Sequence, residues 1–354
     1  MGEAKPAVLV LAGGPDRERA VSLRSGAAVS AALREAGHEV VEADAGPGGL
    51  EALDAWAERC GMNGGPGSQS PDRRGNSGDD SGGDSGGDSG GDSGGDSGGC
   101  VAFPAMHGPW GEGGPLQEEL ERRGLAFVGS GSGASRVAMD KAATKRVMRE
   151  LGVRTPGWAE VARGERVADA VRSPEADPQG GFVVKAVSEG SSLGMSFCET
   201  SEEVHAACAR LLETYDRVLV EQRVEGAELT VGWLGGAALP AIRIEAADGG
   251  YDYAAKYDRD DTRYLFETGL PGATVEGMAH DAERLCAAVG CRHLARVDFL
   301  VDAKGVAWCL EVNTLPGFTD HSLLPMAAAR AGAPMPALCS RLVAMAAREG
   351  ASLI

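Results

Sequence analysis

The stretch from His293 to Ser322 constrains the fold of this chain more than any other (HLARVDFLVDAKGVAWCLEVNTLPGFTDHS). It predicts two short apolar strands joined by a turn at residues 302–305, because Asp at the first position and Gly at the fourth are typical of a type I turn. This turn predicts three cross-strand pairs: Val301 with Val306, Asp298 with Cys309, and Arg296 with Glu311. Because side chains alternate along a strand, four polar residues are expected on one face: Arg296, Asp298, Glu311 and Asn313.

That shared face has the composition of a metal site. Asp298 and Glu311 are expected to be diagonal neighbours, roughly 7–8 Å apart. Two carboxylates and the Asn313 carboxamide oxygen at that spacing suit a hard cation, Mg²⁺ above all. Mg²⁺ keeps open positions for water and phosphate oxygens, so such a site usually indicates a nucleotide. The alternative is a salt-bridged, solvated sheet face around Arg296, and the hairpin by itself leaves both interpretations open.

Composition narrows the class of protein. The chain has 354 residues, enough for two or three domains, and a formal net charge of −18, which argues against nucleic acid as the main partner. Its eight cysteines include no CxxC pair and its histidines are scattered, so we expect free thiols in a reducing compartment rather than a zinc or disulfide framework. The apolar run Ala7–Ala12 is too short for a signal peptide or a membrane span, so we expect a cytoplasmic protein with no membrane partner.

The first part of the chain predicts an α/β domain. The run Ala7–Ala12 is typical of a strand buried on both faces. Gly13-Gly14 turns the chain into a helix over residues 18–36, and a second strand is expected over residues 38–43. Strand, glycine turn, helix and strand are the opening of a doubly wound α/β fold.

A low-complexity segment interrupts this domain between Gly61 and Gly99 and ends in five DSGG units. The repeats contain no apolar residue and carry like charge, so we expect them to be disordered. We interpret the segment as a passive insertion in a surface loop, whose ends can lie close together at modest entropic cost.

The middle of the chain combines histidine and lysine residues with glycine-rich loops. His107 follows a strand and precedes several glycines, which is where α/β folds place ligands. A helix is expected over residues 132–151, with Lys141 and Lys145 on one face, where lysines are usually solvated. Lys185 lies within the apolar strand Phe182–Val187, and burying it costs free energy unless an anion pairs with it. The loop Ser188–Gly194 offers N–H and hydroxyl donors to phosphates.

The last part predicts further strands, a polar segment and closing helices. Strands are expected over residues 218–222, 229–234 and 239–246, with Glu221 and Glu228 near the first two. The polar segment of residues 251–264, which contains Lys256 and Tyr257, is a candidate lid. Helices are expected over residues 275–289, 322–330 and 336–348.

Taken together, the motifs resemble the D-alanine–D-alanine ligase family of the ATP-grasp superfamily. Eight matches follow one another in the family's order: AGGPDRERAVSLRSG, FPAMHGPWGEGG, MDKAATK, VVKAVSEGSSLGMS, VEQRVEGAELTV, YDYAAKY, ARVDF and EVNTLPGFTDHSL. The resemblance covers nearly the whole chain apart from the DSGG tract. It implies an N-terminal doubly wound α/β domain (residues 1–137), a central ATP-grasp lobe (138–224) and a C-terminal ATP-grasp lobe (225–354).

The resemblance also implies a role for each motif. ATP would be held by Lys141, Lys185, Glu189, Ser191, Ser192, Glu221, Val224, Glu228 and Lys256. Two Mg²⁺ (or Mn²⁺) would be held by Asp298, Glu311 and Asn313. The amino-acid sites would be formed by Glu18, His107, Tyr257, Arg296, Gly317, Ser322 and Leu323. The groups acting in catalysis would be Glu18, Ser191, Tyr257, Arg296 and Ser322, with the first three forming a hydrogen-bonded triad between lid and N-terminal domain.

The implied activity is ATP-dependent ligation of two D-alanines through an acyl phosphate, by a cytoplasmic homodimer that supplies peptidoglycan precursors. The lid departs from the family's usual pattern at Gly250, Ala254 and Glu267-Thr268, and the usual GEDG is here Gly111-Glu112-Gly113-Gly114. These departures spare the metal and phosphate ligands, and Tyr257 favours an amine as the second substrate. Two alternatives remain: a ligase of the same chemistry for other amino acids, and a nucleotide-binding protein without catalysis.

Overall fold

The N-terminal part of the molecule is built on a parallel sheet. The computed structural model describes residues 5–45, 50–62, 99–171, 180–190, 194–246, 261–319 and 321–351. Strands β1 (Ala7–Ala12), β2 (Val40–Asp44) and β3 (Cys100–Pro104) pair in the order β2-β1-β3, all parallel. Four helices belong to the same part of the chain: α1 (Arg19–Glu35), α2 (Leu50–Arg59), α3 (Gly108–Glu112) and α4 (Pro115–Arg122). The predicted α/β opening is therefore confirmed, and β1 is buried along most of its length.

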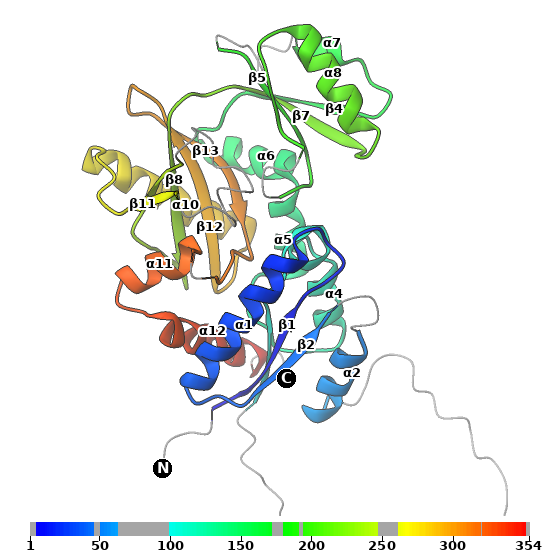
Figure 1. Ribbon diagram of the computed structural model, residues 1–354, viewed down its shortest axis with the longest axis vertical. Coiled ribbons are helices and arrows are strands. Elements are labelled where there is room, and N and C mark those ends of the chain that lie inside the picture. Colours follow the sequence, from blue (N-terminus) through cyan, green and yellow to red (C-terminus); the bar gives the residue numbers. More distant parts are fainter. Residues whose placement is uncertain are drawn as a thin grey trace, which may run out of the picture.

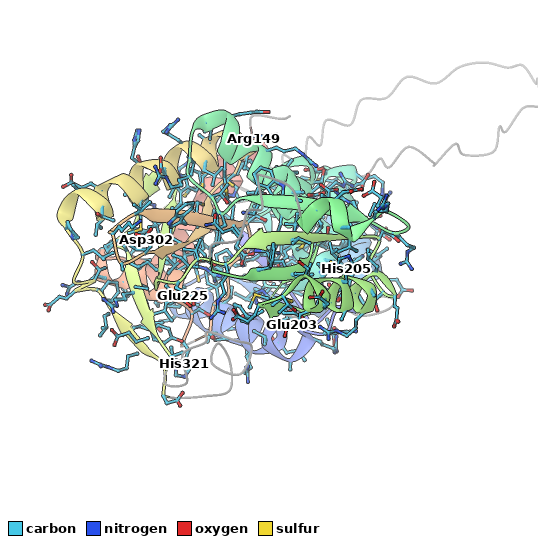
Figure 2. The ribbon with its side chains drawn as sticks, turned by 90° about the horizontal axis from the view of Figure 1, so that it is seen from above. Arg149, Glu203, His205, Glu225, Asp302 and His321 are labelled. Carbon is cyan, nitrogen blue, oxygen red and sulfur yellow. The ribbon has the colours of Figure 1, made fainter. Side chains whose placement is uncertain are left out.

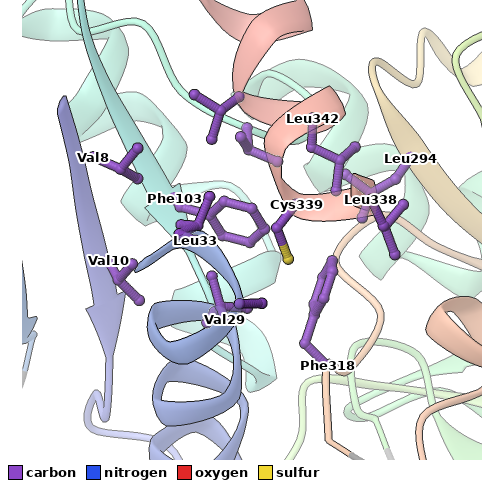
Figure 3. Packing of buried hydrophobic residues seen from close by; sticks show 14 of the residues in the cluster. Val8, Val10, Val29, Leu33, Phe103, Leu294, Phe318, Leu338, Cys339 and Leu342 are labelled. Carbon is purple, nitrogen blue, oxygen red and sulfur yellow. The ribbon is translucent and has the colours of Figure 1, made fainter. Parts of the chain in front are cut away.

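The last helix of the chain completes this part of the core. Helix α12 (Met335–Ala351) packs beside α1, and its residues Leu338 and Leu342 join the cluster around Val10 and Phe103 (Figures 1 and 3). The Phe103 and Phe318 rings meet edge to face, with centroids 5.3 Å apart. The C-terminal end of the chain is thus held against the N-terminal sheet by apolar burial.

Residues 132–151 form two helices where the sequence predicted one. Helix α5 (Ser132–Met139) ends at Asp140, whose backbone is extended, and α6 (Lys141–Leu151) begins directly after it. The Asp140 carboxylate accepts a hydrogen bond from Ala143 N at 2.8 Å and so caps α6. The single-helix prediction is wrong because an N-capping aspartate stands where the periodicity looks continuous.

A small antiparallel sheet forms the central part. Strands β4 (Trp158–Ala162), β5 (Phe182–Ala186), β6 (Ser196–Cys198) and β7 (Arg217–Gln222) pair in the order β4-β7-β5-β6. Helices α7 (Val167–Val171) and α8 (Ser201–Leu212) pack on it, at the top of the molecule in Figure 1. Polar side chains such as Glu203 and His205 on α8, and Arg149 on α6, are exposed on the outside (Figure 2).

The third sheet contains the hairpin predicted within residues 293–322. Strands β8 (Ala227–Leu234), β10 (Ile242–Glu245), β11 (Arg263–Leu265), β12 (Leu294–Val301) and β13 (Ala307–Asn313) pair in the order β11-β10-β8-β12-β13, and β9 (Ala237–Ala238) pairs with β8. Helices α10 (Gly272–Val289) and α11 (Leu323–Arg330) flank it. Within the described ranges, no helix is long and apolar enough to cross a membrane.

The predicted register of the β12–β13 hairpin is wrong. Val301 pairs with Ala307, because Gly305 adopts a positive φ and the turn takes one residue more on that side. A bulge after Asp298 then shifts the ladder again, so that Asp298 lies directly opposite Glu311, and Arg296 opposite Asn313. The predicted shared face is nevertheless confirmed. The two opposed pairs, Asp298 with Glu311 and Arg296 with Asn313, are two residues apart along each strand, so all four side chains lie on one face.

Candidate active site

One cavity is lined by residues from all three parts of the molecule. It is reached by residues from the start of α1, from α3, from the α5–α6 junction, from the loop after β5 and from the β12–β13 hairpin. Its lining is Glu18, Glu112, Ala138, Met139, Lys141, Glu189, Gly190, Arg296, Glu311, Val312, Asn313 and Thr314. Six of the site residues expected from the sequence therefore line one cavity: Glu18, Lys141, Glu189, Arg296, Glu311 and Asn313. A seventh, Asp298, forms an ion pair with Arg296 of that lining.

The acidic residues of the hairpin are held by cations. Arg296 donates to both carboxylate oxygens of Asp298, at 2.9 and 2.8 Å. The Thr230 hydroxyl adds a third hydrogen bond to Asp298, at 2.6 Å. Opposite, Glu311 Oε2 lies 3.3 Å from Lys141 Nζ. These cations offset the charge of two carboxylates that would otherwise repel each other across the strands.

The donor set fits a hard divalent cation. Asp298 and Glu311 supply carboxylate oxygens from directly opposed positions, and Asn313 adds an amide oxygen that accepts from Leu315 N at 2.9 Å. Within the described ranges, no group of three or more His, Cys, Asp or Glu side chains could hold a metal. The proposed metal ligands include only two acidic side chains, Asp298 and Glu311. The remaining coordination positions would be filled by the Asn313 carboxamide and by oxygens of a ligand.

Lys141 connects the hairpin to the loop expected to hold phosphates. As the first residue of α6, it donates from Nζ to the backbone oxygen of Glu189 while it pairs with Glu311. The Glu189 carboxylate in turn accepts from Tyr215 Oη at 2.8 Å. Ser191 and Ser192, the donors expected from the same loop, lie outside the described residues, as do Lys256 and Tyr257 of the expected lid.

A second acidic residue, Glu221 on β7, is buried between two lysines. Its carboxylate lies 2.7 Å from Lys185 Nζ and 3.1 Å from Lys145 Nζ. Burial would raise the pKa of the Glu221 carboxyl, but the two ammonium groups outweigh it and hold that pKa below its usual range. Burial lowers the pKa of Lys145, whereas at Lys185 the carboxylates of Glu221 and Glu311 outweigh burial and raise the pKa.

The prediction that Lys145 is solvated is wrong. Its side chain is fully buried and also donates to Thr155 Oγ1 at 2.6 Å and to the Pro156 backbone oxygen at 3.1 Å. The signal was available: Lys145 lies three residues after Ala142 and three before Met148, both on the apolar face of α6. Its position on that face indicated burial against an anion.

The remaining residues expected at the nucleotide lie beyond β7. Val224 is half-buried in the link between β7 and β8, and Glu228 is half-buried near the start of β8, where it pairs with Leu300 and Ile244. Both therefore lie close in the chain to Glu221, at the junction between the central and the C-terminal sheets.

At the other end of the site, His107 meets the loop after β13. Its Nε2 lies 3.2 Å from Ser25 Oγ, and Ser25 Oγ accepts a hydrogen bond from Phe318 N at 3.3 Å. A Cβ on Gly317 would lie 2.9 Å from Ser322 Oγ and 3.8 Å from His107 Cε1, so only glycine fits this loop without displacement. Burial, with a smaller contribution from Arg296, lowers the pKa of His107 to about 4.

Ser322 and Leu323 begin helix α11. Ser322 Oγ accepts from Thr319 N at 2.8 Å and so fixes the turn that leads into the helix. Leu323 is buried in a cluster with Ile242 and Ile244. Ser322 is thus placed close to Gly317, while the Leu323 side chain contributes to the wall of the core.

Glu112 also lines the cavity, although the sequence did not predict it as a site residue. It lies opposite Glu18 across Gly190, because a Cβ on Gly190 would be 3.3 Å from Glu18 Oε2 and 3.6 Å from Glu112 Oε1. Burial, and then the charge of Glu18, raises the pKa of Glu112 well above its usual range. The GEGG motif at residues 111–114 gives no local signal for this contact, because it depends on the packing of α3 against the start of α1.

Comparison with known proteins gives consistent matches. A family model described as D-ala D-ala ligase N-terminus matches residues 7–130, and one described as D-ala D-ala ligase C-terminus matches residues 147–344. A D-alanine–D-alanine ligase of Syntrophotalea carbinolica is 37% identical over 346 residues, which are 98% of this chain and 96% of the relative. A ligase of that name from Stutzerimonas stutzeri is 41% identical over 328 residues, covering 92% of this chain and 89% of the relative.

A solved structure of a D-alanine–D-alanine ligase from Bacillus anthracis superposes with a TM-score of 0.74 at 26% identity. The match covers 99% of this chain and all of the other. The likeness confirms the expected mixed α/β fold with its ATP-grasp part.

Proposed function

Because the chain belongs to the D-alanine–D-alanine ligase family, whose models match most of its length, we propose that it joins two D-alanines to D-alanyl-D-alanine with consumption of ATP. ADP and phosphate are the other products. The observation that carries the proposal is the cavity in which Lys141, Arg296 and Glu311 come together from different parts of the chain. Cations, acidic oxygens and a phosphate-binding loop in one cavity are what phosphoryl transfer to a carboxylate needs.

In the first step, a carboxylate oxygen of one D-alanine attacks the γ-phosphorus of ATP, ADP leaves, and an acyl phosphate forms. Lys141 and Lys185 are proposed to hold the phosphates, with the backbone of Glu189 and the hydroxyls of Ser191 and Ser192. Mg²⁺ or Mn²⁺ on Asp298, Glu311 and Asn313 supplies, when bound, positive charge to the phosphate oxygens. Arg296 now occupies both oxygens of Asp298, so it and the metal compete for that carboxylate.

In the second step, the amine of the other D-alanine attacks the acyl carbon, and phosphate leaves as the amine loses its proton. The guanidinium of Arg296 and the backbone at Gly317 are proposed to stabilise the oxyanion of the tetrahedral intermediate. Because an acyl phosphate hydrolyses readily, the site must exclude water, and the segment with Lys256 and Tyr257 is proposed as its cover.

The amino-acid sites are proposed at the end of the cavity near His107. Glu18 supports binding of an ammonium group, since it is a buried acidic residue that lines the cavity. Ser322 and Leu323 are proposed beside the second amino acid, with Tyr257 and Ser191 completing a triad with Glu18. Adenine and ribose are proposed near Glu221, Val224 and Glu228.

Three further proposals concern organisation. We propose domains at residues 1–137, 138–224 and 225–354, which agree with the spans of the three sheets, although α12 packs on the first of them. A cytoplasmic homodimer serving cell-wall precursor synthesis is proposed from the family. D-alanine and ATP are the proposed partners, and nucleic acid is not expected because the chain carries a formal net charge of −18.

A second candidate is a ligase of the same chemistry that joins other amino acids. It is favoured by Gly250, Ala254 and Glu267-Thr268, which differ from the usual lid of the family. Its metal and phosphate residues would be the same as those above.

Phosphate release from ATP with a panel of D- and L-amino acids tests the proposal. We expect release that depends on D-alanine, with D-alanyl-D-alanine identified by mass spectrometry. Release that depends on another pair would replace the first candidate by the second. No release with any amino acid, from a folded protein that still binds ATP, would contradict both.

A further inference from the structure

Two cysteines stand at the two ends of the low-complexity segment. Cys60 directly follows α2, and Cys100 is the first residue of β3. All the residues of the DSGG tract lie between them in the chain. Neither cysteine belongs to the candidate active site, so their pairing needs an explanation of its own.

The fold brings the two thiols together. Both side chains pack against the same apolar cluster, which includes Leu53 and Trp56 of α2, and the two thiols are hydrogen-bonded. The backbone on each side is fixed: Cys60 N donates to Trp56 O at 3.0 Å, and Cys100 pairs with Ala7 of β1. Cross-linking would therefore join two positions that the fold already holds side by side.

Exposure distinguishes this pair from the other cysteines. Cys60 and Cys100 are half-buried, whereas the remaining six are buried: Cys198, Cys208, Cys286, Cys291, Cys309 and Cys339. Cys286 and Cys291 are also hydrogen-bonded to each other, but they lie inside the core of the third sheet. A dissolved oxidant can reach the first pair without unfolding of the protein.

A cation stands beside the pair. The Arg59 guanidinium, which also binds Glu39 at 2.6 Å, interacts with both thiols. Burial and the hydrogen bond to Cys100 raise the pKa of the Cys60 thiol, and Arg59 opposes that rise. The Cys60 side chain is thus held mainly as the thiol, and the charge of Arg59 favours its reactive thiolate form.

We propose that Cys60 and Cys100 form a reversible dithiol–disulfide site, which a low-molecular-weight disulfide oxidises to a cross-link that closes the chain over residues 61–99. One cysteine thiolate attacks the external disulfide, forms a mixed disulfide and releases one external thiolate. The second cysteine, after loss of its proton, attacks the protein sulfur of that mixed disulfide and releases the other external thiolate. In sum, two protein thiols are oxidised and one external disulfide is reduced to two thiols.

The cross-link would change stability more than activity. It removes conformational freedom from the unfolded chain, while the folded positions of α2 and β3 are already adjacent. We therefore expect the oxidised protein to melt several degrees higher than the reduced one, with turnover changed less than about twofold.

Peptide mapping of the full chain tests the proposal directly. Trypsin cuts after Arg59, Arg73, Arg74 and Arg122, so Cys60 and Cys100 fall on separate peptides, residues 60–73 and 75–122. After incubation of the folded protein with oxidised glutathione and alkylation of free thiols, we expect these two peptides to be linked. Dithiothreitol should release them and reverse the rise in melting temperature.

The variants Cys60→Ser and Cys100→Ser are matched to each other. Each should lose the linked peptide and the rise in melting temperature, and should retain glutathione on the remaining cysteine because no second thiol resolves the mixed disulfide. Cys286 and Cys291, on the single peptide of residues 285–292, are the internal control and should stay reduced in the folded protein. The proposal is overturned if Cys60 and Cys100 remain free or each carry glutathione without cross-linking.

Discussion

Two clusters of this molecule pair carboxylates with lysine or arginine side chains, and they differ in solvent exposure. In the hairpin cluster, Asp298 and Glu311 pair with Arg296 and Lys141 at the wall of a cavity, and the Glu311 side chain keeps 29% of its exposure. In the sheet cluster, Glu221 pairs with Lys145 and Lys185, and the Lys145 side chain has no exposure at all. We infer that a ligand replaces partners in the first set of ion pairs, whereas burial keeps Lys145 and Glu221 paired.

The difference follows from the cost of desolvation. A charge inside the core must keep its partner, because an uncompensated buried charge is strongly destabilising. A charge at a cavity can exchange its partner for water, metal or phosphate at lower cost. We therefore expect substitutions in the sheet cluster to change stability and substitutions in the hairpin cluster to change catalysis.

The largest effect is expected for Lys145→Met. This variant leaves Glu221 with Lys185 alone and leaves the Thr155 hydroxyl without its partner. We expect the free energy of unfolding to fall by about 3–5 kcal/mol. Guanidinium denaturation measures it, with Lys141→Met as the matched control, for which we expect a smaller loss because its ion pair with Glu311 lies at the cavity. Equal losses in the two variants would erase the distinction between the clusters.

Next in size is the effect of Glu311→Gln on catalysis. The substitution keeps the shape of the side chain and removes the charge that faces Lys141 and the proposed metal. We expect turnover to fall by at least ~10², with little change in stability. Steady-state phosphate release provides the measurement. Near-normal turnover would remove Glu311 from the proposed metal site.

A smaller effect concerns the pH dependence of stability at His107. Its pKa in the folded protein is about 4, below the ordinary value of 6.5, so protons bind the unfolded state more readily. The contribution of His107 to stability is therefore complete above pH 6.5 and is lost as the pH falls toward 4. We expect a loss of about 2 kcal/mol between pH 7 and pH 5 from this residue.

Denaturation of the wild type and of His107→Gln at both pH values isolates this contribution. The wild type should lose more stability than the variant over the interval. A variant that loses as much as the wild type would show that His107 takes up no proton on unfolding in this range.

The smallest effect is expected from deletion of residues 64–98. The cavity and both acidic clusters lie outside this segment, so we expect turnover to stay within about twofold of the wild type. The phosphate assay measures it, and the melting temperature confirms that the shortened chain is folded. Loss of activity in a folded deletion variant would contradict our interpretation of the segment as passive.

The sequence predicted the chemistry of the site better than its geometry. The alternation of side chains placed Asp298 and Glu311 on one face, and this survived although each predicted cross-strand pair was wrong. The turn at Gly305 and the bulge after Asp298 each shift the ladder by one residue, and no residue of the hairpin signals the bulge. The shared face could be predicted because it depends only on the alternation of side chains along each strand. The cross-strand pairs also depend on the exact length of the turn and on the bulge.

Other features depended on contacts between distant segments. Lys145 could have been recognised as buried from its position on the apolar face of α6, but its partner Glu221 lies on another sheet. The meeting of Glu112 with Glu18 depends on how α3 and α1 pack. Strand β4 was not predicted, although its pairing with β7 completes the sheet that carries Glu221.

The most direct test of the distinction between the clusters is manganese binding in the presence of a non-hydrolysable ATP analogue, followed by electron paramagnetic resonance. We predict that the wild-type protein binds Mn²⁺ with the analogue, and that Asp298→Asn and Glu311→Gln each weaken this binding by at least tenfold. Unchanged manganese affinity in both variants would contradict the assignment of the metal to the β12–β13 hairpin.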